Sequence, residues 1–219
     1  YAGGMVKNDV VDVELDREER PGRPLPAGRI PLARAAFVAN GLLAVGALAA
    51  CGAAVLAACP APAFVGAALT AAVWIYNRHA KGTLAGTAVM GSCRGLNWLL
   101  GMTAAGWPPA VLWLLPLGMG LYVTGITLFA RDEAGQGRRG RLLAGMLVMA
   151  AGLAVAGSVP GLALSSTSLA PPLWVAAGRL PAWLLLWGVL SLSILARCLQ
   201  AVLDPVPARM QAAVGNAIM

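Results

Sequence analysis

The chain has 219 residues, of which 59% are apolar and only 11% are charged. Soluble domains carry about 25% charged residues, so this composition excludes a cytosolic enzyme, a disordered tail and a disulfide scaffold. The net charge of +7 would indicate nucleic acid in a soluble chain, but cytoplasmic loops of membrane proteins collect Lys and Arg. We therefore expect an integral membrane protein that is surrounded by lipids and has no nucleic-acid partner.

The two ends of the chain both read as parts of helices. Residues 1–16 have the pattern of the end of a helix whose start is missing, and residues 1–6 are too short an apolar run for a signal peptide. The last eleven residues, 209–219, stop inside a helical pattern. We expect a single transmembrane domain over residues 1–219 that is incomplete at both termini.

Three oxygen-bearing side chains, Asn8, Asp12 and Asp16, recur every four residues in the first segment. On a helix this spacing keeps them on one face over about 12 Å. Stacked carboxylates repel one another unless a cation neutralises them. Because Mg²⁺ is usually held by one or two carboxylates together with substrate phosphates, the spacing favours a magnesium site.

A loop rich in proline and arginine follows. Arg20, Arg23 and Arg29 stand among prolines in a stretch that cannot be a helix interior. A guanidinium group can bind a phosphate with two parallel hydrogen bonds. An arginine-rich loop beside a magnesium site therefore predicts a diphosphate pocket. A solvated cytoplasmic loop of mixed charge explains the same spacing equally well.

Six apolar runs come next, each close to the length of about 20 residues that crosses the hydrocarbon core. They are residues 35–59, 61–76, 84–105, 109–130, 142–164 and 182–203. The second run is short, and it crosses only if Asn77 and Arg78 snorkel or if the helix continues past them. The pattern predicts an all-α, polytopic transmembrane helix bundle with about six complete spans and partial helices at both ends.

The charges alternate between successive connections. All Lys and Arg residues except Arg94 and Arg179 lie at residues 7–34, 77–83, 131–141 or near the C-terminus, and all carboxylates lie on the same side. Since Lys and Arg mark cytoplasmic loops, we expect any polar chemistry at the cytoplasmic mouth of the bundle.

Two further features concern the interior of the bundle. Arg94 lies within an apolar run, and ionisable residues at such depth normally face the bundle interior or a wet cavity. We expect Arg94 near the diphosphate or paired with Asp132 or Glu133, unless it snorkels from a helix that begins near residue 90.

Six glycines are expected to let helices approach closely: Gly41, Gly46, Gly52, Gly82, Gly86 and Gly91.

The acidic segment and its loop resemble the first signature of the UbiA superfamily of intramembrane prenyltransferases, through Asn8-Asp9-x-x-Asp12-x-x-x-Asp16 and Arg23-Pro24-Leu25-Pro26-Ala27-Gly28-Arg29. Weaker similarity at residues 76–81 and 91–96 extends the resemblance over nearly the whole chain. The Cys93-Arg94 pair and the loop at residues 131–133 are most similar to the EboC-type, UbiA-like branch.

The resemblance implies about nine helices around a central cavity, in which two acidic motifs bind Mg²⁺ and a prenyl diphosphate. By this resemblance the metal ligands are Asn8, Asp12, Asp16 and Asp132. The substrate-binding residues are Arg23, Arg29, Tyr76, Lys81, Arg94 and Asp132, and the catalytic residues are Asp12, Asp16 and Lys81.

The second acidic motif departs from the family pattern. The family has D-x-x-x-D after the sixth helix, whereas this chain has adjacent Asp132 and Glu133. Neighbouring residues point about 100° apart on a helix, so both cannot face one ion. One carboxylate can still serve a second Mg²⁺, with Arg131 or Arg138 taking part of the phosphate charge.

The leading prediction is Mg²⁺-dependent transfer of an isoprenoid chain from a prenyl diphosphate to an aromatic or lipid-like acceptor within the membrane. The competing hypothesis is a non-catalytic, UbiA-like isoprenoid-binding or transport-associated protein, which the altered second motif favours. A CDP-alcohol phosphatidyltransferase would need a D-x-x-D-G-x-x-A-R run that is absent. We expect a multi-pass protein of a bacterial inner membrane with its active-site loops on the cytoplasmic side.

Overall fold

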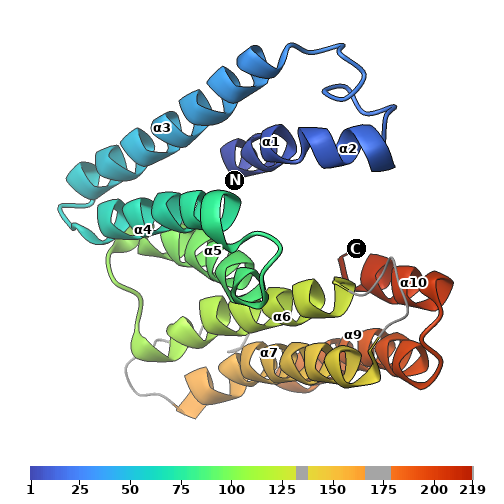
Figure 1. The fold of residues 1–219 in the computed structure, drawn as a ribbon. Coiled ribbons are helices and arrows are strands. Elements are labelled where there is room, and N and C mark those ends of the chain that lie inside the picture. The colour runs from blue at the N-terminus through green and yellow to red at the C-terminus, as the bar shows by residue number, and fades with distance from the viewer. Residues whose placement is uncertain (132–137, 166–178, 219) are drawn as a thin grey trace.

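The computed structural model describes residues 1–131, 138–165 and 179–218, and every regular element in these ranges is a helix (Figure 1). The all-α fold expected from the sequence is therefore confirmed. The helices are α1 (Ala2–Val11), α2 (Val13–Glu19), α3 (Leu32–Leu56), α4 (Ala61–Ile75), α5 (Leu84–Met102), α6 (Leu114–Ala130), α7 (Arg139–Ser165), α9 (Leu180–Leu203) and α10 (Pro207–Ile218). Three short helical turns complete them: η1 (Tyr76–Ala80), η2 (Thr103–Ala105) and η3 (Ala110–Trp113).

All six apolar runs form helices, and four of them are long and apolar enough to cross a membrane. These four are Leu32–Leu56, Ala110–Ala130, Arg139–Leu164 and Leu180–Leu203. The side chains of α3 and α9 are largely exposed, and in α3 Val55 and Leu56 are 79% and 90% exposed. Apolar side chains that lack a protein partner on this scale face lipid, so the chain is an integral membrane protein.

The short second run is extended by a wider helical turn. Helix α4 has 15 residues, and η1 continues it as a π-helix of five residues that ends at Ala80. Together they cover residues 61–80, which is about 30 Å at the rise of an α-helix. The helix therefore continues past Asn77 and Arg78, which is one of the two ways in which the sequence allowed this run to cross.

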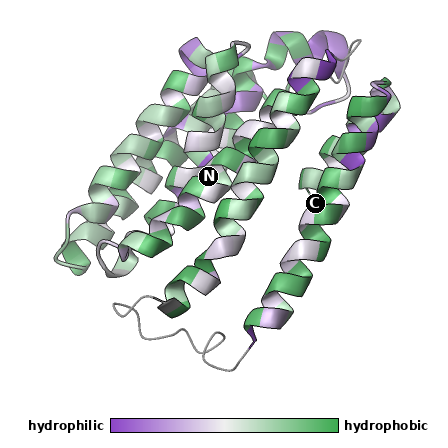
Figure 2. Cartoon of the chain, turned by 90° about the horizontal axis from the view of Figure 1, so that it is seen from below, coloured by the Kyte–Doolittle hydropathy of each residue, from purple (hydrophilic) through white to green (hydrophobic). Residues whose placement is uncertain are grey.

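The polar residues gather at one end of the helices. Figure 2 shows the hydrophilic residues mainly at the end of the bundle that holds α2 and the loop after it, while the helices are apolar along most of their length. The turn after α3 and the segment between α5 and α6 lie at the opposite end (Figure 1). This distribution agrees with the alternation of charge along the sequence.

Helices α5, α6 and α7 approach one another through glycines. A Cβ atom on Gly91 of α5 would lie 2.3 Å from the backbone oxygen of Gly120, and one on Gly125 of α6 would lie 2.5 Å from the backbone nitrogen of Met149. These distances leave no room for a side chain. Small residues thus set the spacing of these helices, as is usual in membrane bundles.

The prediction for the six glycines is only partly right. Gly86 and Gly91 meet backbone atoms closely, but Gly82 lies in a turn with φ +79. For Gly41, Gly46 and Gly52 of α3, no atom of the described residues lies within 4 Å of an added Cβ. The sequence marks small residues but does not show whether they face a neighbouring helix or open space.

A second packed region joins the C-terminal helices. Its largest fully buried side chains include Phe129 of α6, Leu142 and Met149 of α7, Cys198 of α9 and Met210 of α10. The hydroxyl of Tyr122 donates to the backbone oxygen of Ala217 at 2.7 Å, which fixes α10 against α6. The helices α6, α7, α9 and α10 therefore share one packed hydrophobic core.

We predict that Gly125→Ala lowers the melting temperature of the detergent-solubilised protein by about 3 °C or more, because the added methyl group forces α6 and α7 apart. The matched control is Gly188→Ala in α9, where an added Cβ has no described atom within 4 Å. Thermal unfolding monitored by intrinsic tryptophan fluorescence measures both. Equal melting temperatures for the two variants would contradict the assigned close packing.

Candidate functional site

The acidic residues of the first segment share one helical face. Asp12 is the junction of α1 and α2, yet its backbone nitrogen donates to Asn8 at 2.9 Å, and that of Asp16 donates to Asp12 at 2.8 Å. The hydrogen-bond ladder of the helix therefore continues through the junction. As the four-residue spacing requires, Asn8, Asp12 and Asp16 lie in succession at the polar end of the bundle, and Asp16 is buried with 6% of its surface exposed.

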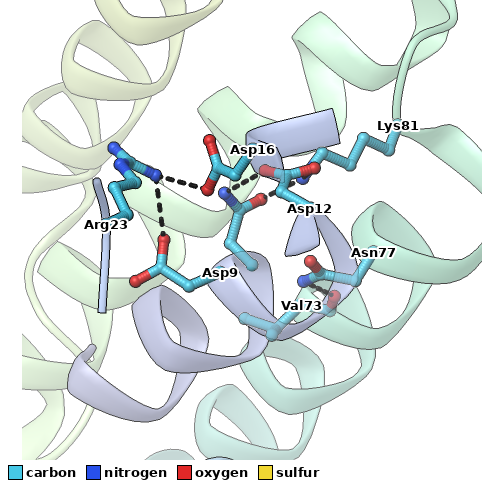
Figure 3. Close-up of polar contacts among 8 residues, drawn as sticks. Asp9, Asp12, Asp16, Arg23, Val73, Asn77 and Lys81 are labelled. Carbon is cyan, nitrogen blue, oxygen red and sulfur yellow. Dashed lines mark hydrogen bonds and ion pairs between the residues drawn. The ribbon is translucent and has the colours of Figure 1, made fainter. Parts of the chain in front are cut away.

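Lys81 connects this face to the turn that follows α4 and η1. The chain leaves the helical conformation at Lys81, directly after η1. Its Nζ donates to Oδ1 of Asn8 at 2.6 Å and forms an ion pair with Oδ1 of Asp12. Nδ2 of Asn8 in turn donates to Oδ2 of Asp12 at 2.9 Å, so the three side chains form a closed ring of polar contacts (Figure 3).

Arg23 neutralises the other carboxylates from the loop after α2. Its Nη1 lies 2.7 Å from Oδ2 of Asp16 and 3.6 Å from Oδ1 of Asp9, as Figure 3 shows. The hydrogen bond to Asp16 raises the pKa of Arg23 above its ordinary value. The guanidinium group therefore holds its charge and fixes the loop to the helix.

The donor set of this cluster fits Mg²⁺. The oxygens of Asn8 and Asp12 already converge on one cation, the Lys81 ammonium group, and amide and carboxylate oxygens are the ligands that Mg²⁺ prefers. No group of three His, Cys, Asp or Glu residues in the described part of the chain is placed to hold a metal ion. Such a site would hold an ion that keeps waters and ligand phosphates in its coordination shell.

The cluster opens into a cavity of about 300 Å³ between α1, α3, α4 and α5. Asn8 and Asp9 line its polar end, and Gly46 lines it from α3. The open space around Gly46 is therefore part of this cavity. Most of the wall is apolar and includes Leu42, Leu43, Leu69, Val73, Met90 and Leu100.

Two polar residues at the end of α4 line the same cavity. The Lys81 ammonium group lies 5.9 Å from the centroid of the Tyr76 ring. Asn77 is 8% exposed, and its Nδ2 donates to the backbone oxygen of Val73 at 2.9 Å. Its Oδ1 is buried without a partner among the described residues. The sequence left open whether Asn77 snorkels or lies within a longer helix, and only the three-dimensional contacts place it in the cavity wall.

The remaining predicted site residues lie apart from the carboxylate cluster. Arg94 lines the cavity and donates from Nη2 to the hydroxyl of Tyr1 at 3.0 Å. Arg29 is exposed, and its side chain forms no hydrogen bond or ion pair with the described residues. Asp132 and Glu133 lie outside the described residues.

Arg131 links the end of α6 to the turn that follows Lys81. Its Nη2 donates to the backbone oxygen of Gly82 at 2.7 Å, and its Nη1 donates to that of Thr83. The sequence placed Arg131 in a role toward phosphate and gave no signal for these carbonyl partners. This contact brings the beginning of the second acidic loop beside the turn that carries Lys81.

The fold and the site together define a class: a polytopic helical membrane protein in which a cation-neutralised carboxylate cluster lies at one end of an apolar cavity. The chain belongs to the UbiA prenyltransferase family, whose model matches residues 1–218. This confirms the family that the sequence motifs indicated. The placement in the EboC-type branch stays a prediction.

Several curated proteins are similar to parts or most of the chain. A digeranylgeranylglyceryl phosphate synthase of Ignicoccus hospitalis is 30% identical, with 94% of this chain and 69% of the relative covered. Synthases of the same name from Methanoculleus marisnigri and Sulfurisphaera tokodaii are 58% and 49% identical over 45 residues, which cover 20% of this chain and 16% of each relative. No solved structure is significantly similar to the chain.

We predict that Arg23→Gln destabilises the protein by about 1–3 kcal/mol, because it leaves the buried carboxylate of Asp16 without its cation. The matched control is Arg17→Gln, whose partner Glu14 is also 2.7 Å away but has 76% of its side chain exposed. Such exposed pairs contribute about 0–1 kcal/mol. Thermal unfolding in detergent compares the two variants, and equal losses would show that the burial of Asp16 has no energetic role.

Proposed function

We propose that this protein transfers an isoprenoid chain from a prenyl diphosphate to an acceptor in the membrane, in a reaction that depends on Mg²⁺. The observation that carries the proposal is the ring of Asn8, Asp12 and Lys81 beside the Arg23–Asp16 pair at the polar end of an apolar cavity. Oxygen ligands and cations together suit a metal-bound diphosphate. The apolar wall suits the isoprenoid tail.

The roles of the residues follow from their chemistry. Mg²⁺, held by Asn8, Asp12 and Asp16, would neutralise charge that develops on the departing diphosphate. Lys81 and Arg23 add positive charge at the same end of the cavity, which favours loss of the diphosphate. The bond between the allylic carbon and the diphosphate oxygen breaks, a bond to a nucleophilic atom of the acceptor forms, and the acceptor's proton leaves to solvent. The apolar wall keeps water away from the allylic cation.

The names of the relatives support a finer proposal for the substrates. A digeranylgeranylglyceryl phosphate carries two geranylgeranyl groups on glyceryl phosphate, so its precursor with one such group has a single free hydroxyl. We extend this chemistry to the present chain, with geranylgeranyl diphosphate as donor and geranylgeranylglyceryl phosphate as acceptor. The excess of Lys and Arg at the polar end supports a cytoplasmic orientation of that end, and a bacterial inner membrane stays the predicted location.

The altered second motif supports the alternative of an isoprenoid-binding protein without turnover. The two functions differ in one measurement. A prenyltransferase consumes labelled geranylgeranyl diphosphate when Mg²⁺ and an acceptor are present, whereas a binding protein retains the diphosphate unchanged.

We predict that Asp12→Asn and Asp16→Asn each lower the Mg²⁺-dependent turnover of labelled geranylgeranyl diphosphate by about a hundredfold or more, because each removes an anionic metal ligand. Removal of Mg²⁺ with EDTA should abolish turnover in the unchanged protein. Glu18→Gln, at an exposed acidic residue of α2, is the control and should retain full activity. Turnover that survives EDTA and both Asp variants would contradict the metal-bound diphosphate.

A separate prediction concerns Asp132 and Glu133. Since neighbouring residues do not share a helical face, we expect Asp132→Asn to reduce turnover and Glu133→Gln to have little effect. The same assay with the full-length protein measures both variants. Equal and negligible effects would remove this loop from the mechanism.

A further inference from the structure

Arg94 carries a positive charge deep in the bundle. It lies in α5, ten residues after Leu84, which is about 15 Å along the helix axis from its start. It lines the same cavity as Asn8 and Asp9. Ionisable residues at membrane depth are costly, and they generally mark a site of function with a partner of opposite charge.

The partner of Arg94 in the structure is aromatic and neutral. Its Nη2 donates to the hydroxyl of Tyr1 at 3.0 Å, and its Cζ lies 4.5 Å from the centroid of the Tyr1 ring. No carboxylate of the described residues forms an ion pair with Arg94. A guanidinium group has five N–H donors, and a cation–π contact offsets only part of its desolvation.

The cations at the polar end differ from Arg94 in this respect. Lys81 is paired with Asp12, and Arg23 is paired with Asp16 and Asp9. Among the described residues Arg94 has no carboxylate partner, and its positive charge can meet an anion that enters the cavity. Asn97, three residues further along α5, lines the same cavity and offers an amide N–H₂ group.

We propose that Arg94 binds the anionic group of the acceptor, a carboxylate or a phosphate monoester, at a subsite separate from that of the donor diphosphate. The planar fork of a guanidinium group matches either anion with two parallel hydrogen bonds. The inference rests on the proposed prenyl transfer, because it assigns the diphosphate to the residues at the polar end. A subsite of this kind would favour acceptors that carry a negative charge over neutral phenols and neutral lipids.

Equilibrium binding to the full-length protein in detergent tests the proposal without relying on turnover. The probes are two anions, each with a neutral analogue: geranylgeranylglyceryl phosphate with geranylgeranylglycerol, and 4-hydroxybenzoate with 4-hydroxybenzamide. Arg94→Gln should weaken binding of one anionic probe about tenfold or more, since a charge-assisted hydrogen bond is lost, and should leave its neutral analogue unaffected. Which anion responds identifies a phosphate or a carboxylate acceptor.

Two further variants separate a role of the charge from a role in folding. Arg94→Lys should restore part of the lost affinity. Arg197→Gln removes an exposed arginine from the membrane-spanning helix α9 and should leave the affinity for every probe unchanged. The affinity for geranylgeranyl diphosphate, measured on the same samples, should stay within about twofold in Arg94→Gln.

Three results would overturn the proposal. Equal losses for an anionic probe and its neutral analogue would show a structural role, and a loss confined to geranylgeranyl diphosphate would assign Arg94 to the donor. Unchanged affinity for both anionic probes would show that Arg94 binds no acceptor. Selective loss of an anionic probe in a protein without turnover would support the Arg94 subsite while contradicting the proposed enzyme.

Discussion

The polar end of the molecule depends on the contacts that the ammonium group of Lys81 makes with Asn8 and Asp12. It joins Asn8 and Asp12 of the first helix to the turn after α4, across an interval of 73 residues in the case of Asn8. Without a cation at this point, the carboxylates of the first helix would repel one another on one face. Because the same turn accepts hydrogen bonds from Arg131 at Gly82 and Thr83, it also fixes the position of α6 relative to the site.

Glycines have two different roles in the bundle. In α5 to α7, glycines remove the space between helices, and Gly125 lies almost against the backbone of α7. In α3, Gly46 borders the cavity instead. A packed hydrophobic core of α6, α7, α9 and α10 thus supports the N-terminal half, which has a cavity beside its charged residues. Rigid support of this kind holds the charged groups at fixed positions, which electrostatic stabilisation of a leaving group requires.

The sequence predicted the helices well, because uninterrupted apolar runs and alternating charges depend on the membrane more than on tertiary contacts. It also predicted that Asn8, Asp12 and Asp16 share a face, since that follows from helical periodicity alone. The sequence did not predict which residues these side chains contact. Residues 8 and 81 meet only when α1 and α4 pack together, and spacing within one helix carries no information about that contact.

Buried polar groups were also difficult to interpret from the sequence. Asn77 is compatible with a snorkelling residue at a helix end, yet it is buried, with its amide bonded to Val73. Arg94 was recognised as unusual because a charge within an apolar run is rare. Its contact with Tyr1 joins two residues that are 93 positions apart, and no local pattern encodes it.

The π-helical turn at residues 76–80 lets the helix absorb a difference of one residue in chain length before the lysine of the site. A π-turn contains one residue more than the α-helical turn it replaces, and such turns often arise where an insertion has been retained for a functional reason. Four residues of an α-helix turn through about 400°, which is nearly as far as the five residues of this π-turn. Loss of one residue from Tyr76–Ala80 would therefore restore α-helical hydrogen bonding and leave the direction of the following chain almost unchanged. The lysine would still face the first helix, so related chains that are one residue shorter here can keep this contact.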